Sequence, residues 1–200
     1  MVGEILERRP RIRNASTSDS QEPTMPRIPY VPSDLAEPKA IVDAVRARRG
    51  GKLLELDRML LHSPPLAAGW NGMLGAVRQQ LSLSPKLREL AILAVAVVNG
   101  AEYEFRQHAP EFLKAGGTQA QVDALQDPDC ALLDEALFDA AERAVLALTI
   151  EMTRTVRVAD ATFDAARRAL PREQHVVELV GTVAAYNMVS RFLVALGVGE

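Results

Sequence analysis

The sequence predicts an all-α protein with a single helical domain. Ala and Leu dominate a composition in which aromatic residues make up only 4%, and both are among the best helix formers. Apolar residues recur at helical spacing between short breaks rich in Pro and Gly, and no segment keeps the alternation of a strand for more than a few residues. A chain of 200 residues is long enough for one domain with a substantial core but short for two.

The N-terminal residues differ from the rest of the chain. Residues 1–25 contain closely spaced arginines and then a polar, serine-rich stretch, without the apolar core of a secretory signal. We therefore expect a disordered tail, although a start site assigned upstream of Met25 would leave the same pattern. Residues 26–38 hold four prolines, which exclude a continuous helix and predict an extended arm. The folded domain should span residues 26–200, with Tyr30 and Val31 pinning the arm to it.

Within this domain we expect about eight helices. Glycines that favour helix ends occur at positions 50, 100 and 116, and serines precede a first-turn proline at positions 63 and 84. Thr118 and Gln121 have the spacing of a capping box. The predicted helices cover residues 38–48, 53–61, 64–80, 86–98 and 101–115, a short stretch after 118, and then 132–153, 160–170 and 171–196. Helix 86–98 is apolar on nearly every side, so it should lie at the centre of the core.

Composition also excludes several classes of function. A net charge of −3 gives no electrostatic footprint for nucleic acid. Cys130 is the only cysteine, so a disulfide framework within the chain is impossible and a cytoplasmic location is expected. The longest apolar run, residues 91–98, is far shorter than the ~18 residues that a membrane span requires, so no membrane partner is expected.

Residues 87–117 carry the candidate chemistry. Glu89 lies in the first turn of an otherwise apolar helix, where burial would raise the pKa of its carboxyl group. Glu104 and His108 are four residues apart and share one face of the next helix. A carboxylate beside an imidazole fixes the tautomer of the ring and raises its basicity. Two carboxylates and a histidine in one partly buried space are suited to moving a proton.

The same segment resembles the core motif of the carboxymuconolactone decarboxylase and alkyl hydroperoxidase D superfamily. In the peroxidase branch a Glu precedes a Cys-x-x-Cys pair and a His. These four positions correspond to Glu89, Ala101, Glu104 and His108, so both thiols are absent here. The segments 27–35, 53–78 and 84–96 and the final helix resemble the branch without the cysteine pair. The resemblance implies an alkyl hydroperoxidase D-like helical bundle that uses no metal or organic cofactor and assembles as a homo-oligomer, a trimer or hexamer.

We therefore predict a cofactor-independent acid/base enzyme, similar to 4-carboxymuconolactone decarboxylase. It would act as a decarboxylase, isomerase or lyase on a small carboxylated or carbonyl-bearing metabolite. His108 would be the general acid/base, Glu104 would orient it or share its proton, and Glu89 would stabilise the reacting end of the substrate. The alternatives are an alkyl hydroperoxidase-like antioxidant, which the missing motif cysteines disfavour, and a non-catalytic helical oligomer.

Four further residues are expected to bind substrate. Tyr103 and Trp70 are candidates to line the pocket, with packing between helices as the alternative. Asn187 and Arg191 are four residues apart in the apolar final helix, where a buried arginine needs an anion such as Glu89, Glu178 or a substrate carboxylate. Two carboxylates and one histidine would suit iron or zinc, but no second histidine lies one helical turn away, so no metal site is expected.

Overall fold

The computed structural model describes residues 26–199, and every regular element in that range is an α-helix. This confirms the predicted all-α fold, with an extended segment before the first helix. The predicted tail, residues 1–25, lies outside the described residues. The helices are α1 (Lys39–Arg48), α2 (Glu55–Leu60), α3 (Pro64–Gln79), α4 (Pro85–Asn99), α5 (Glu102–Lys114), α6 (Gln119–Ala124), α7 (Pro128–Leu133), α8 (Ala140–Thr155), α9 (Asp160–Ala169) and α10 (Glu173–Leu196).

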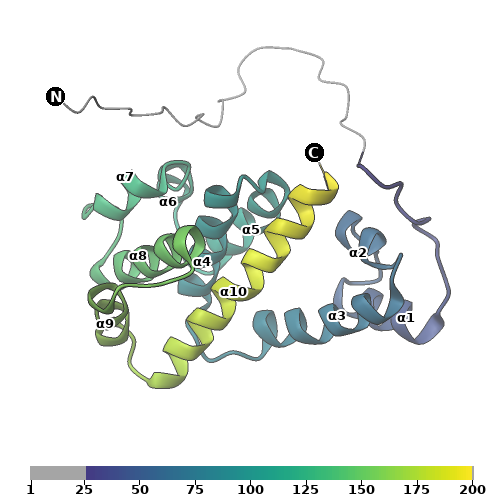
Figure 1. The fold of residues 1–200 in the computed structure, drawn as a ribbon, viewed down its shortest axis with the longest axis horizontal. Coiled ribbons are helices and arrows are strands. Elements are labelled where there is room, and N and C mark those ends of the chain that lie inside the picture. Colours follow the sequence, from purple (N-terminus) through teal and green to yellow (C-terminus); the bar gives the residue numbers. More distant parts are fainter. Residues whose placement is uncertain (1–25, 200) are drawn as a thin grey trace, which may run out of the picture.

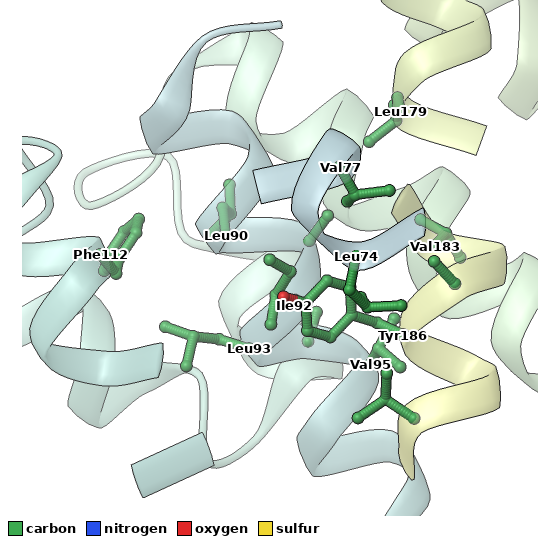
Figure 2. Close-up of a cluster of buried hydrophobic side chains, with 14 of the residues drawn as sticks. Leu74, Val77, Leu90, Ile92, Leu93, Val95, Phe112, Leu179, Val183 and Tyr186 are labelled. Carbon is green, nitrogen blue, oxygen red and sulfur yellow. The ribbon is translucent and has the colours of Figure 1, made fainter. Parts of the chain in front are cut away.

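The core is built around α4 and α10. Every residue of α4 from 89 to 96 is buried, which confirms that this helix lies at the centre. Helix α10 crosses the molecule and separates α1–α3 from α4–α9, while α4 packs against α5, α8 and α10 (Figure 1). Side chains from α3, α4, α5 and α10 meet in one apolar cluster (Figure 2). Three of the four helices that build this cluster also supply charged residues to the site described below.

The length and composition of α10 are sufficient to cross a membrane, but half of its most apolar window is buried inside the protein. Its contacts with α3, α4, α5, α8 and α9 explain that burial. We therefore regard α10 as a core helix, whose apolar character comes from packing on several sides.

The boundaries between α6, α7 and α8 correct one prediction. Residues 132–153 were expected to form one long helix, but the chain breaks between α7 and α8. The Asp127 side chain accepts a hydrogen bond from the Cys130 amide (3.1 Å) and starts α7. Asp139 and Glu142 form a capping box that starts α8, with backbone-to-carboxylate distances of 2.8 and 3.0 Å. These two caps satisfy orphan amides that a continuous helix would not expose, and both patterns are present in the sequence.

The N-terminal arm is attached to the end of α10. The Arg27 amide donates to the Leu196 carbonyl (2.9 Å), and the Gly199 amide donates to the Tyr30 hydroxyl (3.0 Å). Arg58 lies over the Tyr30 ring and donates to the Val31 carbonyl (2.7 Å). The arm is therefore pinned at Tyr30 and Val31, as predicted.

The turn after α5 depends on a glycine. A Cβ at Gly117 would lie 2.3 Å from the ring of Phe112, which is completely buried and cannot move aside without repacking the core. We expect Gly117→Ala to lower the free energy of unfolding by about 1–3 kcal/mol, the usual cost of overpacking. Denaturant unfolding of the purified protein measures this change.

Gly75→Ala is the matched control for this prediction. Gly75 lies inside α3, and an added Cβ would meet only Arg48 Cδ at 3.8 Å, an ordinary contact. Alanine is a better helix former than glycine, so this variant should gain up to about 1 kcal/mol. Equal losses in the two variants would show that the turn does not have the tight contact described.

Candidate active site

A cavity of about 330 Å³ lies between α2, α3, α4, α5 and α10. Apolar residues of α2 and α10 form part of its wall, and most of the rest consists of charged and polar residues of α3, α4 and α5, with Arg49 from the end of α1. Exposed side chains at Gln79, Gln107 and Glu111 belong to its lining, so the cavity communicates with solvent. Its volume is at the lower end of the range for small-molecule sites.

Glu89 and His108 form the closest charged contact in the cavity. His108 Nδ1 lies 2.6 Å from Glu89 Oε2, and both side chains are only 6% exposed. Arg88 Nε donates to the other carboxylate oxygen of Glu89 at 3.3 Å. Burial raises the pKa of Glu89, but the hydrogen bond from His108 and the nearby positive charge outweigh it and hold the pKa below its ordinary value. Glu89 is therefore an ionised carboxylate that fixes the His108 ring.

Arg78 contacts the other side of the same ring. Its Nη2 lies 2.9 Å from His108 Nε2, and its Nε donates to the Tyr186 hydroxyl at 2.7 Å. The Tyr186 ring meets the His108 ring edge-on, with 5.0 Å between centroids. Burial lowers the pKa of His108, and the charge of Arg78 lowers it further against the opposing effect of Glu89. His108 is therefore neutral at physiological pH.

Glu104 lies in the same cavity but is bonded elsewhere. Ser190 Oγ lies 3.0 Å from Glu104 Oε1, and Glu104 Oε2 is buried without a hydrogen-bond partner among the described residues. Burial raises the pKa of Glu104 well above its ordinary value, despite the opposing effects of Ser190 and Arg78. Ser190 has one hydroxyl hydrogen for two neighbouring acceptors, because the Tyr186 carbonyl lies 2.8 Å away. A protonated Glu104 resolves this conflict by bringing a hydrogen of its own.

The three predicted catalytic residues therefore meet in one cavity, although their contacts differ from the expectation. Glu104 was expected to orient His108 from one helical turn away, and Glu89 to stabilise the substrate. In the structure Glu89 binds the ring of His108, whereas Glu104 turns toward Ser190 on α10. The reason is that α4 lies against α5 and brings Glu89 directly under the ring.

Only one of the four predicted substrate-binding residues lines this cavity. Tyr103 does, and burial raises its pKa to about 12. Trp70 packs against Phe192 with 5.2 Å between ring centroids. Asn187 donates to Thr153 Oγ1 at 3.0 Å, and Arg191 is an exposed residue that donates to the Asn187 carbonyl. The expectation that Arg191 is buried was wrong, because its side of α10 faces away from the core.

The comparisons with known proteins agree with this geometry. Residues 64–148 match the model of the Carboxymuconolactone decarboxylase family. This segment includes Arg78, Glu89, Glu104 and His108 and runs from the start of α3 into α8. Residues 64–148 are therefore similar to that family. The resemblance inferred from residues 87–108 is thus confirmed, and no curated protein matches the chain.

Several solved structures share the fold. An alkylhydroperoxidase AhpD core, a peroxidase-related protein from Ralstonia eutropha JMP134, has a TM-score of 0.73 at 18% identity over 87% of this chain and 91% of its own. The debrominase Bmp8 in complex with 2,3,4-tribromopyrrole has a TM-score of 0.70 at 16% identity, covering 91% and 94%. A peroxidase-related protein from Silicibacter sp. TM1040 has a TM-score of 0.68 at 16% identity, covering 92% and 94%. At these identities the likeness establishes the AhpD-like fold alone.

The segment that matches the family model contains one site residue that sequence reasoning missed. Arg78 is the only charged residue of α3, and it follows Trp70 and Leu74 at intervals of four, on the buried face of that helix. A lone arginine that continues an apolar stripe is a usable signal for a buried functional cation, because a charge in such a place needs a partner. Tyr186, its hydrogen-bond partner, is completely buried and has a pKa that burial raises to about 12.

The arginines that line the cavity, Arg49, Arg78 and Arg88, differ in their partners. Arg49 and Arg88 lie 3.1 and 3.3 Å from the carboxylates of Asp57 and Glu89. Arg78 has no carboxylate within ion-pair distance among residues 26–199. Within the same residues, no three His, Cys, Asp or Glu side chains are grouped so as to hold a metal ion. The arrangement suits a small anion held near a neutral histidine and a protonated carboxylic acid.

The protonation of Glu104 predicts how stability depends on pH. Because its folded pKa is raised, the unfolded chain loses this proton first, and the wild type loses stability as pH rises from about 4.3 toward the folded pKa. Glu104→Gln cannot ionise, so its free energy of unfolding should rise relative to the wild type over that range. Chemical denaturation at pH 4 and pH 8 measures the difference.

Glu102→Gln is the control, because Glu102 is on the same helix and its side chain is 63% exposed. The difference in free energy of unfolding between Glu102→Gln and the wild type should change little between pH 4 and pH 8. If the free energy of unfolding of Glu104→Gln instead falls relative to that of the wild type as pH rises, Glu104 is ionised in the folded protein.

Proposed function

We propose that the protein is a cofactor-independent acid/base enzyme that acts on a small carboxylated metabolite, as a decarboxylase, isomerase or lyase. One observation carries the proposal: His108, held between Glu89 and Arg78, and the buried Glu104 line one cavity, whose Arg78 has no carboxylate partner among the described residues. The similarity of residues 64–148 to the family supports the same class of chemistry.

The two titratable groups have opposite roles in this proposal. His108 takes up or returns a proton at Nε2, and the ionised Glu89 at Nδ1 stabilises the imidazolium that forms. Glu104 is the acid, because burial raises the pKa of its carboxyl group well above the ordinary value. The two carboxyl groups of the site, Glu104 and Glu89, have pKa values shifted in opposite directions, upward and downward, and such a divergence is typical of acid/base sites in enzymes.

The proposed reaction needs no group beyond these side chains. In an isomerisation, His108 removes a proton beside a carbonyl, the electron pair is held as an enolate, and Glu104 delivers a proton at another carbon. In a decarboxylation, the C–C bond to the carboxylate breaks and CO2 leaves. The electron pair of that bond enters the conjugated system of the substrate, and the resulting carbanion is protonated by Glu104. Guanidinium groups near the developing oxyanion stabilise both intermediates.

His108→Gln should lower kcat on the authentic substrate by at least about 100-fold, the usual scale for an acid/base residue. A panel of small unsaturated lactone and keto acids is assayed by NMR in D2O, which reports deuterium incorporation, isomerisation and loss of CO2 together. His62→Gln is the matched control, because His62 is exposed, does not line the cavity, and has its side chain bonded to the Pro29 carbonyl of the arm (2.7 Å). Full activity in His108→Gln would remove His108 from the mechanism.

The thiol peroxidase alternative receives no support from the geometry. The positions of the motif cysteines hold Ala101 and Glu104, and Cys130 is an exposed residue of α7 that does not line the cavity. Peroxidatic chemistry needs a thiolate at the reaction centre. Acid/base chemistry is therefore the better account of the residues that are present.

We also propose that copies of this chain associate through exposed apolar side chains of α3 and α10. Leu66 and Met73 on α3 are 47% and 46% exposed, and Val177 and Met188 on α10 are 71% and 38% exposed. Apolar side chains gathered on neighbouring helices are typical of interfaces between subunits.

Light scattering should therefore give a mass that is a multiple of 21.8 kDa. Met73→Glu should lower that mass, because it places a charge in the proposed interface. Leu133→Glu is the control, since Leu133 is 78% exposed on α7, away from both helices. A mass of one chain for the wild type would contradict the proposal.

A further inference from the structure

The contact between Arg78 and His108 determines which ring nitrogen of His108 carries the proton. A guanidinium group has five N–H donors and no acceptor, and it stays charged in proteins. In the 2.9 Å contact with Arg78 Nη2, His108 Nε2 must therefore be the acceptor. The ring proton then lies on Nδ1, which donates to Glu89 Oε2 at 2.6 Å. The two contacts together fix both the neutral state and the tautomer of His108.

This arrangement occupies the one ring nitrogen that is able to accept a proton. A proton added to Nε2 would place two N–H donors face to face at 2.9 Å, so His108 cannot be protonated while Arg78 keeps this contact. Glu89 holds Nδ1 on the opposite side of the ring. Proton uptake by His108 therefore requires Arg78 to move.

An anion in the cavity provides a reason for that movement. Arg49 and Arg88 lie beside the carboxylates of Asp57 and Glu89, whereas the hydrogen-bond partners of Arg78 within residues 26–199 are neutral groups, the Tyr186 hydroxyl and the His108 ring. A hydrogen bond between ionised partners is roughly twice as strong as one with a neutral partner. A ligand carboxylate is thus a better acceptor for Nη2 than an imidazole nitrogen.

We propose that Arg78 masks His108, in the sense that its guanidinium occupies the basic nitrogen Nε2. A carboxylate ligand removes this mask by binding the guanidinium and so freeing Nε2. The inference rests on the proposed acid/base role of His108 and adds a determinant of specificity. A carboxylated substrate exposes the base that it needs, while an uncharged analogue enters a cavity in which Nε2 stays occupied. Arg78 is in this sense a positioning residue, which acts through His108.

Other charged groups face the same ring, and the test must separate them from Arg78. Arg88 and Glu89 approach from α4, Glu104 from α5, and Tyr186 from α10. Arg49, at the end of α1, also lowers the pKa of His108 through its charge, yet its guanidinium donates to Asp57, and the His108 ring is bonded to Glu89 and Arg78. Arg49→Met is therefore a matched control that removes a nearby positive charge without removing a ring contact.

The experiment is a pH titration of ¹⁵N-histidine-labelled protein by NMR, with the His108 signals assigned by their loss in His108→Gln. Wild type, Arg78→Met and Arg49→Met are each titrated alone, with acetate and with acetamide, at constant ionic strength. In the wild type we expect the Nδ1–H tautomer. Acetate should raise the midpoint by an amount equivalent to at least about 5-fold tighter binding to the protonated form, and acetamide should leave it unchanged.

The variants distinguish masking of Nε2 by Arg78 from a general electrostatic effect of acetate on the pKa of His108. Arg78→Met should raise the His108 midpoint without any anion, more than Arg49→Met does, and should abolish the response to acetate. Arg49→Met should keep that response. An acetate response that survives in Arg78→Met, equal midpoints in the two variants, or no response in the wild type would each overturn the proposal. The wild-type titration alone decides the last of these, even if a variant fails to fold.

The result is independent of turnover. An acetate response lost in Arg78→Met, together with an active His108→Gln, would establish the mask and reject the proposed function. An inactive His108→Gln, together with no acetate response in the wild type, would support the proposed function and reject the mask.

Discussion

The hydrogen bond between Glu89 and His108 is the interaction on which the rest of the site depends. Glu89 is the only charged residue in the buried run of α4 from 89 to 96, and a carboxylate in such a place needs partners. His108 supplies the closest one and ties α5 to the central helix. Once Nδ1 is committed to Glu89, only Nε2 is left for chemistry, and the fold places Arg78 beside that atom.

The cavity combines features that do not favour stability. Glu104 keeps a carboxyl oxygen buried without a hydrogen-bond partner among the described residues, and Arg78 is a largely buried cation held by neutral groups. Both cost free energy relative to a fully paired or apolar interior. Glu142 also has a buried oxygen without a hydrogen-bond partner among the described residues, but Lys86 Nζ lies 2.6 Å from that atom, and Gln121 and the Asp139 amide donate to the other oxygen. Glu104 has no such cation in an ion pair among the described residues, and this contrast supports a functional reading of the cavity.

Much of the fold follows from local signals in the sequence, but the contacts within the site do not. Helical periodicity and the Thr118 capping box located most of the helices, and the break before α8 was readable from Asp139 and Glu142. The spacing of Glu104 and His108 placed both in one cavity. It did not reveal that Glu104 bonds to Ser190, 86 residues further along, because that choice is made by the packing of α10. Arg191 was misjudged because a helix that is apolar on both sides gives no signal of which side is buried.

The two ends of the described chain close on the same wall of the cavity. Gly199 is bonded through its amide to Tyr30 of the arm and through its carbonyl to Arg106 of α5 at 2.6 Å. A Cβ at Gly199 would lie 2.1 Å from the ring of Tyr103, a residue of the cavity lining. The last turn of the chain is therefore part of the support behind the pocket. Any side chain at position 199 would press on Tyr103 and so on the pocket itself, which makes glycine there a requirement of the site as well as of the turn.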